Sequence, residues 1–78
     1  MTPNQAKTLD AIRHGATMRD VAERFGWTRG ATVAALGRMC RRGLARRQRN
    51  RVAPGKWDVR NTYTLTPAGR AAWIGSLR

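Results

Sequence analysis

The stretch from Thr17 to Arg47, TMRDVAERFGWTRGATVAALGRMCRRGLARR, contains two amphipathic helical patterns that run into an arginine-rich strand. The two patterns flank Gly26-Trp27-Thr28, where the glycine tolerates a left-handed backbone and ends the first helix. Trp27 is large enough to fill the angle between the helices, although a tryptophan in a turn can instead stack on a sugar or a base. The stretch therefore predicts a helix, a tight turn, a second helix and a strand.

Threonines supply the start signals of the two helices around this turn. Thr17 can cap a helix over about residues 17–25, with Asp20 at the position where an acid suits the helix dipole. Thr28 can cap the next helix, which continues over about residues 28–42 until Gly43 breaks the pattern.

Two further helices are expected at the ends of the chain. Thr2-Pro3-Asn4-Gln5 has the form of a capping box and predicts a helix over about residues 3–14, which His14-Gly15 ends. Thr66-Pro67 predicts a last helix over about residues 67–77. Its Trp73 and Leu77 can pack on the first helix, or the terminal helices can form a two-fold dimer contact, and the sequence leaves both open.

The helix over residues 28–42 has two different faces. At helical spacing Val33, Leu36 and Cys40 form the inward stripe, with Met39 at its margin. The opposite face is small at its N-terminal end and cationic at its C-terminal end, and it comprises Thr28, Ala31, Ala34, Ala35, Arg38 and Arg42. Alanines allow close approach to a groove floor and contact thymine methyl groups, and arginines reach phosphates or guanine. The simpler alternative is that the small residues only favour helix formation.

A basic hairpin follows Gly43. Residues 44–49 and 57–66 have strand patterns, the second with Val59, Tyr63 and Leu65 on one face, and Pro54-Gly55 is a turn signal between them. Nine of the residues from 38 to 60 are Arg or Lys, against the single acid Asp58. Such a charge density is either neutralised by a polyanion or left to repel itself.

Composition limits the classes of protein that the chain can represent. Its 78 residues suffice for one small domain, and its 16 Lys and Arg against four acids give a net charge of +12. Arginine outnumbers lysine 14 to 2, which suits phosphate and guanine recognition but also reflects the codon usage of a GC-rich genome. The single Cys40, the lack of a long apolar run and the polar N-terminus point to the cytoplasm.

Catalysis is not expected of this chain. Of its four carboxylates, Asp10, Asp20 and Asp58 have structural uses on a helix face, at a cap and in the hairpin, and there is no paired acid site. The sequence also has no Cys and His spacing for a metal and no glycine-rich phosphate loop. We therefore expect no catalytic residue, no metal, no cofactor and no small-molecule ligand.

The order helix, helix, recognition helix, wing, helix resembles the winged helix-turn-helix superfamily of α+β domains, with a three-helix bundle, a β-hairpin wing at about residues 44–66 and a short C-terminal helix. The segments ATVAALGRMCRRGLARR and YTLTPAGRAAW resemble the DNA-binding core of MarR-type regulators. Two departures stand out: the long terminal helices that build the dimer and the ligand pocket of those regulators have no counterpart here, and RNRVAPGKWDVR does not clearly reproduce the acid and arginine arrangement of their wing. The resemblance implies a single DNA-binding domain over residues 1–78, without ligand-responsive regulation.

These observations predict a small basic protein that binds double-stranded DNA as a repressor, control protein or architectural factor, encoded by a phage or other mobile element and located at the nucleoid or in an infected cell. The recognition helix would enter the major groove, and the wing would lie on the backbone or in the minor groove. The expected contact residues are Thr28, Arg29, Ala31, Thr32, Ala35, Arg38, Arg41, Arg42, Arg46, Arg47, Arg49, Arg51, Lys56 and Arg60. Two alternatives are a structured-RNA or ribosome-binding protein and a small inhibitor that occupies an acidic site on a host enzyme.

Overall fold

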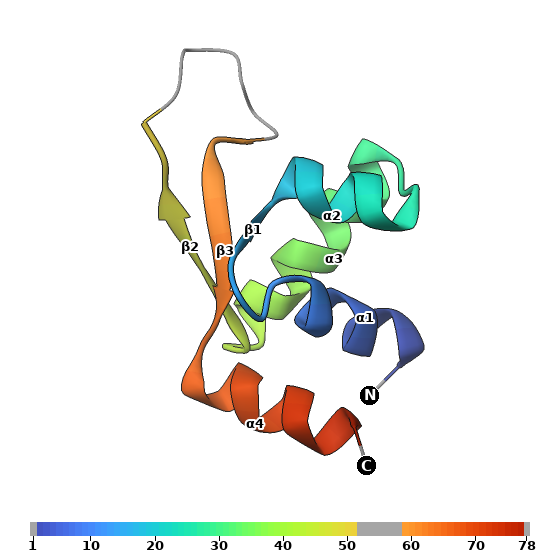
Figure 1. Ribbon diagram of the computed structural model, residues 1–78, viewed down its shortest axis with the longest axis vertical. Helices are drawn as coiled ribbons and strands as arrows, with labels where there is room; N and C mark the ends of the chain where they lie inside the picture. The colour runs from blue at the N-terminus through green and yellow to red at the C-terminus, as the bar shows by residue number, and fades with distance from the viewer. Residues whose placement is uncertain (1, 52–58, 78) are drawn as a thin grey trace.

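Four helices and a three-stranded antiparallel sheet make up the protein, as seen in a computed structural model that describes residues 2–51 and 59–77 (Figure 1). Helices α1, α2 and α3 gather on one side of the strands, and α4 lies at the end of the β2–β3 hairpin opposite Arg49 and Asn61 (Figure 1). The predicted α+β winged helix-turn-helix arrangement is therefore confirmed, with one strand that the sequence patterns did not indicate.

The four predicted helix starts are confirmed by their caps. Helices α1 (Pro3–Ala11) and α2 (Met18–Phe25) each begin with a full capping box, formed by Thr2 with Gln5 and by Thr17 with Asp20. In α3 (Arg29–Arg41) and α4 (Pro67–Ser76), the threonine before the helix accepts a hydrogen bond from the backbone of the third helical residue.

The turn between α2 and α3 has the predicted geometry. Gly26 ends α2 with a φ of 66°, in the left-handed region that a glycine adopts without strain. The Trp27 amide then donates to the Ala22 carbonyl at 3.0 Å, which closes the turn.

The strands lie in the order β1-β3-β2, so β3 is central. The hairpin pairs β2 (Ala45–Arg49) with β3 (Asn61–Leu65), and the two-residue β1 (Ala16–Thr17) pairs with the other edge of β3. Tyr63 and Leu65 of β3 are buried, whereas the last four residues of β2 are exposed on both faces. The hairpin is therefore anchored by β3 and presents β2 to solvent.

A small core joins the helices to the sheet. The most deeply buried hydrophobic residues of this core come from the first three helices and from the C-cap of α1. They are Leu9, Ile12, Val21, Leu36 and Met39. Phe25, Trp27 and Trp73 pack against this core while remaining partly exposed. In a chain of this size the burial of each such side chain is a large part of the net stability.

Several predicted boundaries differ from the observed ones. The first helix ends at Ala11, because the chain must turn through Gly15, with a φ of 91°, to place β1 beside β3. The second hairpin strand begins at Asn61, so Val59 lies before the strand. The predicted Pro54-Gly55 turn lies outside the described residues.

Thr66 and Gly69 fasten α4 to the turn between α3 and β2. The Thr66 hydroxyl donates to the Gly43 carbonyl at 2.6 Å, and the Thr66 amide donates to the Leu44 carbonyl at 3.1 Å. A β-carbon on Gly69 would lie only 1.7 Å from the Leu44 carbonyl oxygen. The segment LTPAG thus brings the start of α4 into close backbone contact with Gly43 and Leu44, which are distant from it in sequence.

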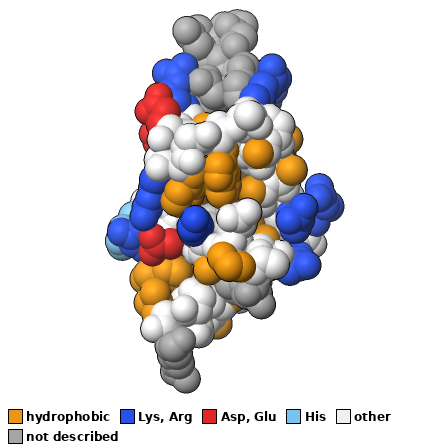
Figure 2. All heavy atoms as spheres, turned by 90° about the vertical axis from the view of Figure 1, so that its right-hand side faces the viewer, with side chains coloured by type: hydrophobic (Ala, Val, Ile, Leu, Met, Phe, Trp, Pro, Cys, Tyr) orange, Lys and Arg blue, Asp and Glu red, His pale blue; other side chains and the backbone are white. Residues whose placement is uncertain are grey.

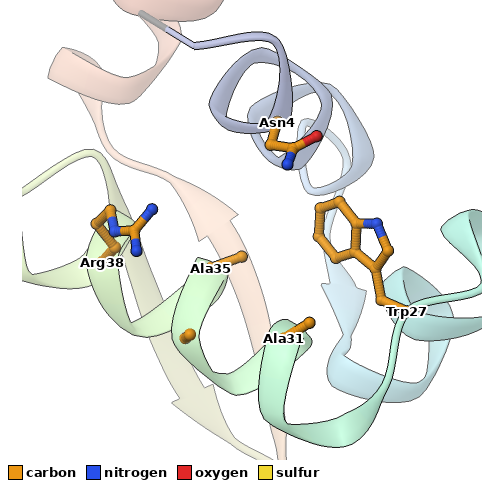
Figure 3. A pocket seen from close by; sticks show the side chains of 6 residues that line it. Asn4, Trp27, Ala31, Ala35 and Arg38 are labelled. Carbon is orange, nitrogen blue, oxygen red and sulfur yellow. The ribbon is translucent and has the colours of Figure 1, made fainter.

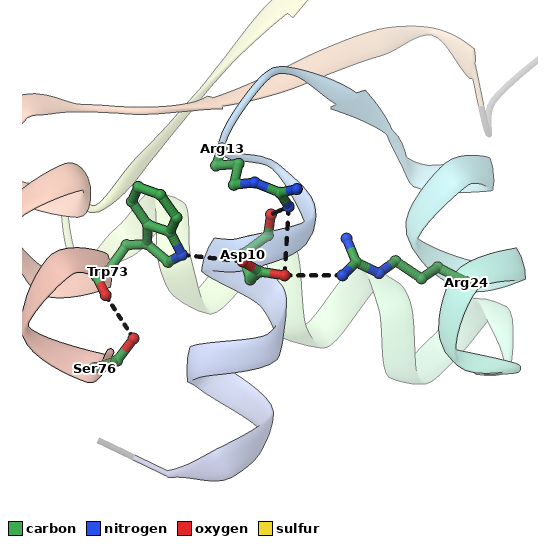
Figure 4. Close-up of polar contacts among 5 residues, drawn as sticks. All are labelled: Asp10, Arg13, Arg24, Trp73 and Ser76. Carbon is green, nitrogen blue, oxygen red and sulfur yellow. Dashed lines mark hydrogen bonds and ion pairs between the residues drawn. The ribbon is translucent and has the colours of Figure 1, made fainter. Parts of the chain in front are cut away.

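Asp10 joins α1 to two other helices (Figure 4). Its carboxylate accepts hydrogen bonds from Arg24 of α2 at 2.8 Å and from the Trp73 indole of α4 at 3.1 Å, and Arg13 lies 3.4 Å away. Burial alone would raise the pKa of Asp10, but the Trp73 and Arg24 hydrogen bonds and the positive charges of Arg13 and Arg24 outweigh it, so its pKa lies below the ordinary 3.8.

Two residues near the end of the chain, Trp73 and Leu77, were expected to pack on the first helix, and only Trp73 does so. Trp73 reaches the Asp10 carboxylate and packs on the core, as predicted. Leu77 is 65% exposed, so its predicted packing on the first helix is wrong. Leu77 lies at the C-cap of α4, beyond the helix itself.

We predict that Gly69→Ala lowers the free energy of unfolding by about 1–3 kcal/mol, because its new methyl group must displace the Leu44 backbone. Gly75→Ala in the same helix is the matched control, since nothing lies within 4 Å of its β-carbon position. The control should be stabilised slightly because alanine favours helix. Urea unfolding of both variants measures the difference, and equal stability would show that the close contact does not exist.

We predict that Asp10 stabilises the fold above about pH 4 and that this contribution is lost as the pH falls through its lowered pKa in the folded protein. The thermal stabilities of the native chain and of Asp10→Asn should therefore differ most near pH 7, and the difference should shrink as the pH falls below the ordinary carboxyl pKa of 3.8. The exposed Glu23→Gln variant is the control. A constant difference between the native chain and Asp10→Asn across this range would contradict the role given to the carboxylate.

Candidate nucleic-acid interface

The surface that α3 presents is set by its buried stripe. Thr32, Leu36 and Met39 are at most 1% exposed, and the Thr32 hydroxyl donates to the Thr28 carbonyl at 2.8 Å. Val33 is 45% exposed. Of the predicted inward stripe, Leu36 is buried and Cys40 packs against the core, as predicted, whereas the inward position of Val33 is wrong. The buried stripe is rotated toward Thr32 and Met39, and Thr32 is removed from the candidate contacts because its side chain lies in the core.

This rotation changes which residues face outward. At helical spacing, Gly30, Ala34, Gly37 and Arg41 form a line on the side away from the buried stripe. A β-carbon on Gly30 would meet nothing within 4 Å, and one on Gly37 would meet only the tip of the Arg41 side chain at 3.3 Å. The N-terminal part of the exposed face, around Gly30 and Ala34, thus carries almost no side-chain volume, and the Arg41 side chain reaches over Gly37.

Ala31, Ala35 and Arg38, which were expected at the centre of the interface, lie along one side of it. They line an open cleft of about 260 Å³ between α3 and the start of α1, together with Asn4, Trp27 and Ala34 (Figure 3). In this view Asn4 and the Trp27 ring stand on one side, and the side chains of α3 stand on the other (Figure 3). The cleft leaves Ala31 and Arg38 exposed at its edge.

Trp27 fills the angle between α2 and α3, as the first of its two predicted roles requires. Its ring centroid lies 4.8 Å from that of Phe25, and both rings pack against the core. The Arg24 guanidinium lies over the Phe25 ring, 5.3 Å from its centroid. These contacts fix the turn and hence the position at which α3 begins.

Arginines surround the outward face of α3 and continue along the hairpin. Eight of them are exposed and form no ion pair with any residue in 2–51 or 59–77, and they are Arg38, Arg41, Arg42, Arg46, Arg47, Arg49, Arg51 and Arg60. Two ion pairs among the described residues join Asp10 to Arg13 and to Arg24. On the face shown in Figure 2, hydrophobic side chains gather in the middle, and Lys and Arg side chains lie at its edges. Like charges this close favour a polyanionic partner.

Asn50 braces the far end of the wing. Its side-chain amide donates to the Val59 carbonyl at 3.1 Å and accepts from the Thr62 hydroxyl at 3.0 Å. Its backbone amide donates to the Arg60 carbonyl at 2.7 Å. The sequence alone did not reveal this role of Asn50, because its side-chain partners lie nine and twelve positions further along the chain.

The other sequence-predicted contacts divide into two groups. Thr28 caps α3, where it accepts from the Ala31 amide at 3.2 Å, and it remains exposed together with Arg29. Lys56 lies outside the described residues, as does Trp57, whose roles in bracing the wing or contacting a sugar stay predictions. The face also includes Gly30, Val33 and Gly37, which the predicted rotation did not place there.

Residues 2–51 and 59–77 provide neither a metal site nor a membrane-spanning helix. In this part of the chain no group of three or more His, Cys, Asp and Glu side chains is placed to hold a metal ion. No helix there has both the length and the apolar composition needed to cross a membrane.

A model of the MarR family matches residues 1–53 of the chain, which is more than half of its length. The chain belongs to the MarR family. No curated protein sequence matches it significantly. Membership of this family agrees with the expectation that the chain is not an enzyme.

Solved structures of MarR-family proteins have the same fold. Wild-type MarR from E. coli is 25% identical with a TM-score of 0.80, and the alignment covers 96% of this chain and 54% of MarR. The transcriptional regulator BldR from Sulfolobus solfataricus is 26% identical with a TM-score of 0.79, covering 97% and 52%. A mutant MarR from E. coli complexed with operator DNA is 27% identical with a TM-score of 0.78, covering 96% and 52%. The chain thus spans about half the length of the MarR-family structures that it matches.

We predict that Asn50→Ala loosens the end of the wing and costs about 1–2 kcal/mol of stability, because the Val59 carbonyl and the Thr62 hydroxyl both lose a partner. Gln48→Ala is the matched control, since its exposed side chain lies on the same strand. Hydrogen exchange at the amides of residues 49–51 and 61–63 should accelerate in Asn50→Ala and not in the control. Unchanged protection would show that this side chain does not hold the wing.

Proposed function

We propose that the chain is the DNA-binding domain of a transcriptional repressor. In this proposal α3 lies in the major groove of duplex DNA, and the β2–β3 wing lies on the flanking backbone or in the adjacent minor groove. The observation that carries it is a set of eight exposed arginines on α3 and along the hairpin, which form no ion pair with a described residue, beside a helix face that carries little side-chain volume around Gly30 and Ala34.

Both parts of this surface suit a duplex. The outward line of Gly30, Ala34 and Gly37 lets the α3 backbone approach the floor of a groove, and the arginines beside it reach phosphates on either side. The start of α3, with Thr28 and Arg29 exposed, also offers backbone amides to a phosphate. Family membership supports the same partner, since a mutant MarR has been solved with operator DNA.

The wing extends the cationic surface away from α3. Arg46, Arg47 and Arg49 project from both faces of β2, so the strand can follow a phosphate backbone whichever face is nearer. The Asn50 contacts hold the two wing strands together beyond the last pair of the ladder. Strands that are linked in this way position their arginines with less loss of conformational entropy on binding.

The proposed repressor acts as a pair of copies. One such domain covers a short DNA site, so useful specificity requires a second one at a fixed spacing. Ile74 and Leu77 at the C-terminal end are 45% and 65% exposed, which provides an apolar surface for the contact. The protein's mass in solution and the symmetry of its preferred DNA sites report on this arrangement together.

We predict that the chain binds duplex DNA and that its affinity falls steeply with salt. If about five to eight phosphates are neutralised, the slope of log affinity against log salt is about −5 to −7. Arg41→Ala should reduce the steepness by about one if this side chain contacts a phosphate. Arg70→Ala, an equal loss of charge on α4, is the matched control and should leave the slope unchanged.

Site selection from random duplexes, followed by salt titration on the selected site, measures these quantities. A preference for structured RNA over the duplex at matched salt would contradict the proposal, as would salt-independent affinity. A tight complex with a host protein that survives nuclease treatment, in the absence of duplex binding, would indicate the inhibitor class instead.

A further inference from the structure

We propose that Val33 determines part of the DNA specificity of this protein by contacting the C5-methyl group of a thymine in the major groove. This inference rests on the proposed function and goes beyond it, because it names the residue and the chemical group that it recognises. The methyl group is the one apolar feature that a base pair presents in the major groove.

The first observation is that Thr32 and Val33 are buried in the opposite order to the one that their polarity would suggest. Thr32 and Val33 have nearly the same shape, yet the polar one is fully buried and the apolar one is 45% exposed. Burial of Thr32 is accommodated by the hydrogen bond from its hydroxyl to the Thr28 carbonyl. Exchange of the two side chains would place the apolar one in the core, so packing alone does not account for the order found.

The second observation is that Val33 protrudes from its surroundings. Of its four neighbours on the helix surface, Gly30 and Gly37 have no side chains and Leu36 is buried, so only Arg29 has a side chain that rises beside it on this face. Valine is also a weaker helix former than alanine because its branched side chain is restricted in a helix. An isolated apolar protrusion on an otherwise small face is therefore suited to contact a partner at that point.

The third observation identifies the partner. Arg41 lies beside Gly37 on the same face, and the arginines of β2 extend the positive charge away from it. An apolar protein surface would not complement this surrounding charge, whereas a groove with phosphates on both sides and a methyl group on its floor complements both features. Duplex DNA is the occupant that fits the charge and the apolar group together.

Replacement of thymine by uracil removes only this methyl group and keeps the base pair, so it tests the contact directly. On the duplex selected by the native chain, replacement of one thymine, or of a symmetric pair, by uracil should weaken binding about fourfold for each methyl group removed, as expected for the burial of a methyl group. Val33→Ala should bind the thymine duplex more weakly by a similar factor and should show no further loss with uracil.

Glu23→Ala is the control, because Glu23 is also exposed but lies on α2 and has no part in the proposed DNA or dimer contacts. This variant should keep the full response to uracil. Val33→Ala should fold normally, since the side chain is outside the core and alanine favours helix, and thermal unfolding checks this.

The outcomes separate the inference from the function on which it rests. Binding to a selected duplex with no uracil-sensitive thymine, or an equal uracil response in Val33→Ala, would overturn the role of Val33 and leave DNA binding intact. Failure of the native chain to bind any duplex would overturn both.

Discussion

The burial of Thr32, Leu36 and Met39 against the core fixes the rotation of α3, and the surface of the protein depends on that rotation. A helix presents a different set of residues for each small turn about its axis, and here the buried stripe leaves Gly30, Val33, Ala34, Gly37 and Arg41 facing outward. The Trp27 and Phe25 pair sets where α3 begins, and the Gly69 contact with Leu44 sets how the chain leaves it. A small number of contacts therefore fixes which face of α3 points outward.

Charge is the second constraint on the molecule. Asp10 holds three helices together, and Asp20 is used in a cap, so these acids serve the fold. No acid of the described residues forms an ion pair with Arg38, Arg41 or Arg42 at the end of α3, or with the arginines of β2. Their mutual repulsion opposes folding, and a polyanion relieves it, so binding is expected to stabilise the folded state.

The sequence predicts the fold well because its signals are local. Thr2, Thr17, Thr28 and Thr66 each precede a helix, and Gly26 ends one, and all five have the predicted roles. The short β1 strand was missed because two residues carry no alternating pattern, and it exists only because β3 lies beside it. Asn50 escaped notice for the same reason, since its partners are distant in sequence.

The candidate site was harder to predict than the fold. Apolar periodicity favoured Val33 as a core residue, whereas the structure buries Thr32, whose hydroxyl is satisfied within the helix. A polar residue that bonds to its own backbone can enter a core at little cost, and hydrophobicity alone does not reveal this. The arginines needed no such detail, because a net charge of +12 leaves most of them at the surface wherever the helices lie.

The central claim is that the outward face of α3 enters the major groove, and methylation interference on a selected duplex tests it most directly. Dimethyl sulfate modifies guanine at N7 in the major groove and adenine at N3 in the minor groove. The structure predicts interference from N7 methylation at the centre of each half-site, with N3 methylation interfering only at flanking positions near the wing. Interference confined to N3, or binding that tolerates N7 methylation throughout the site, would contradict it.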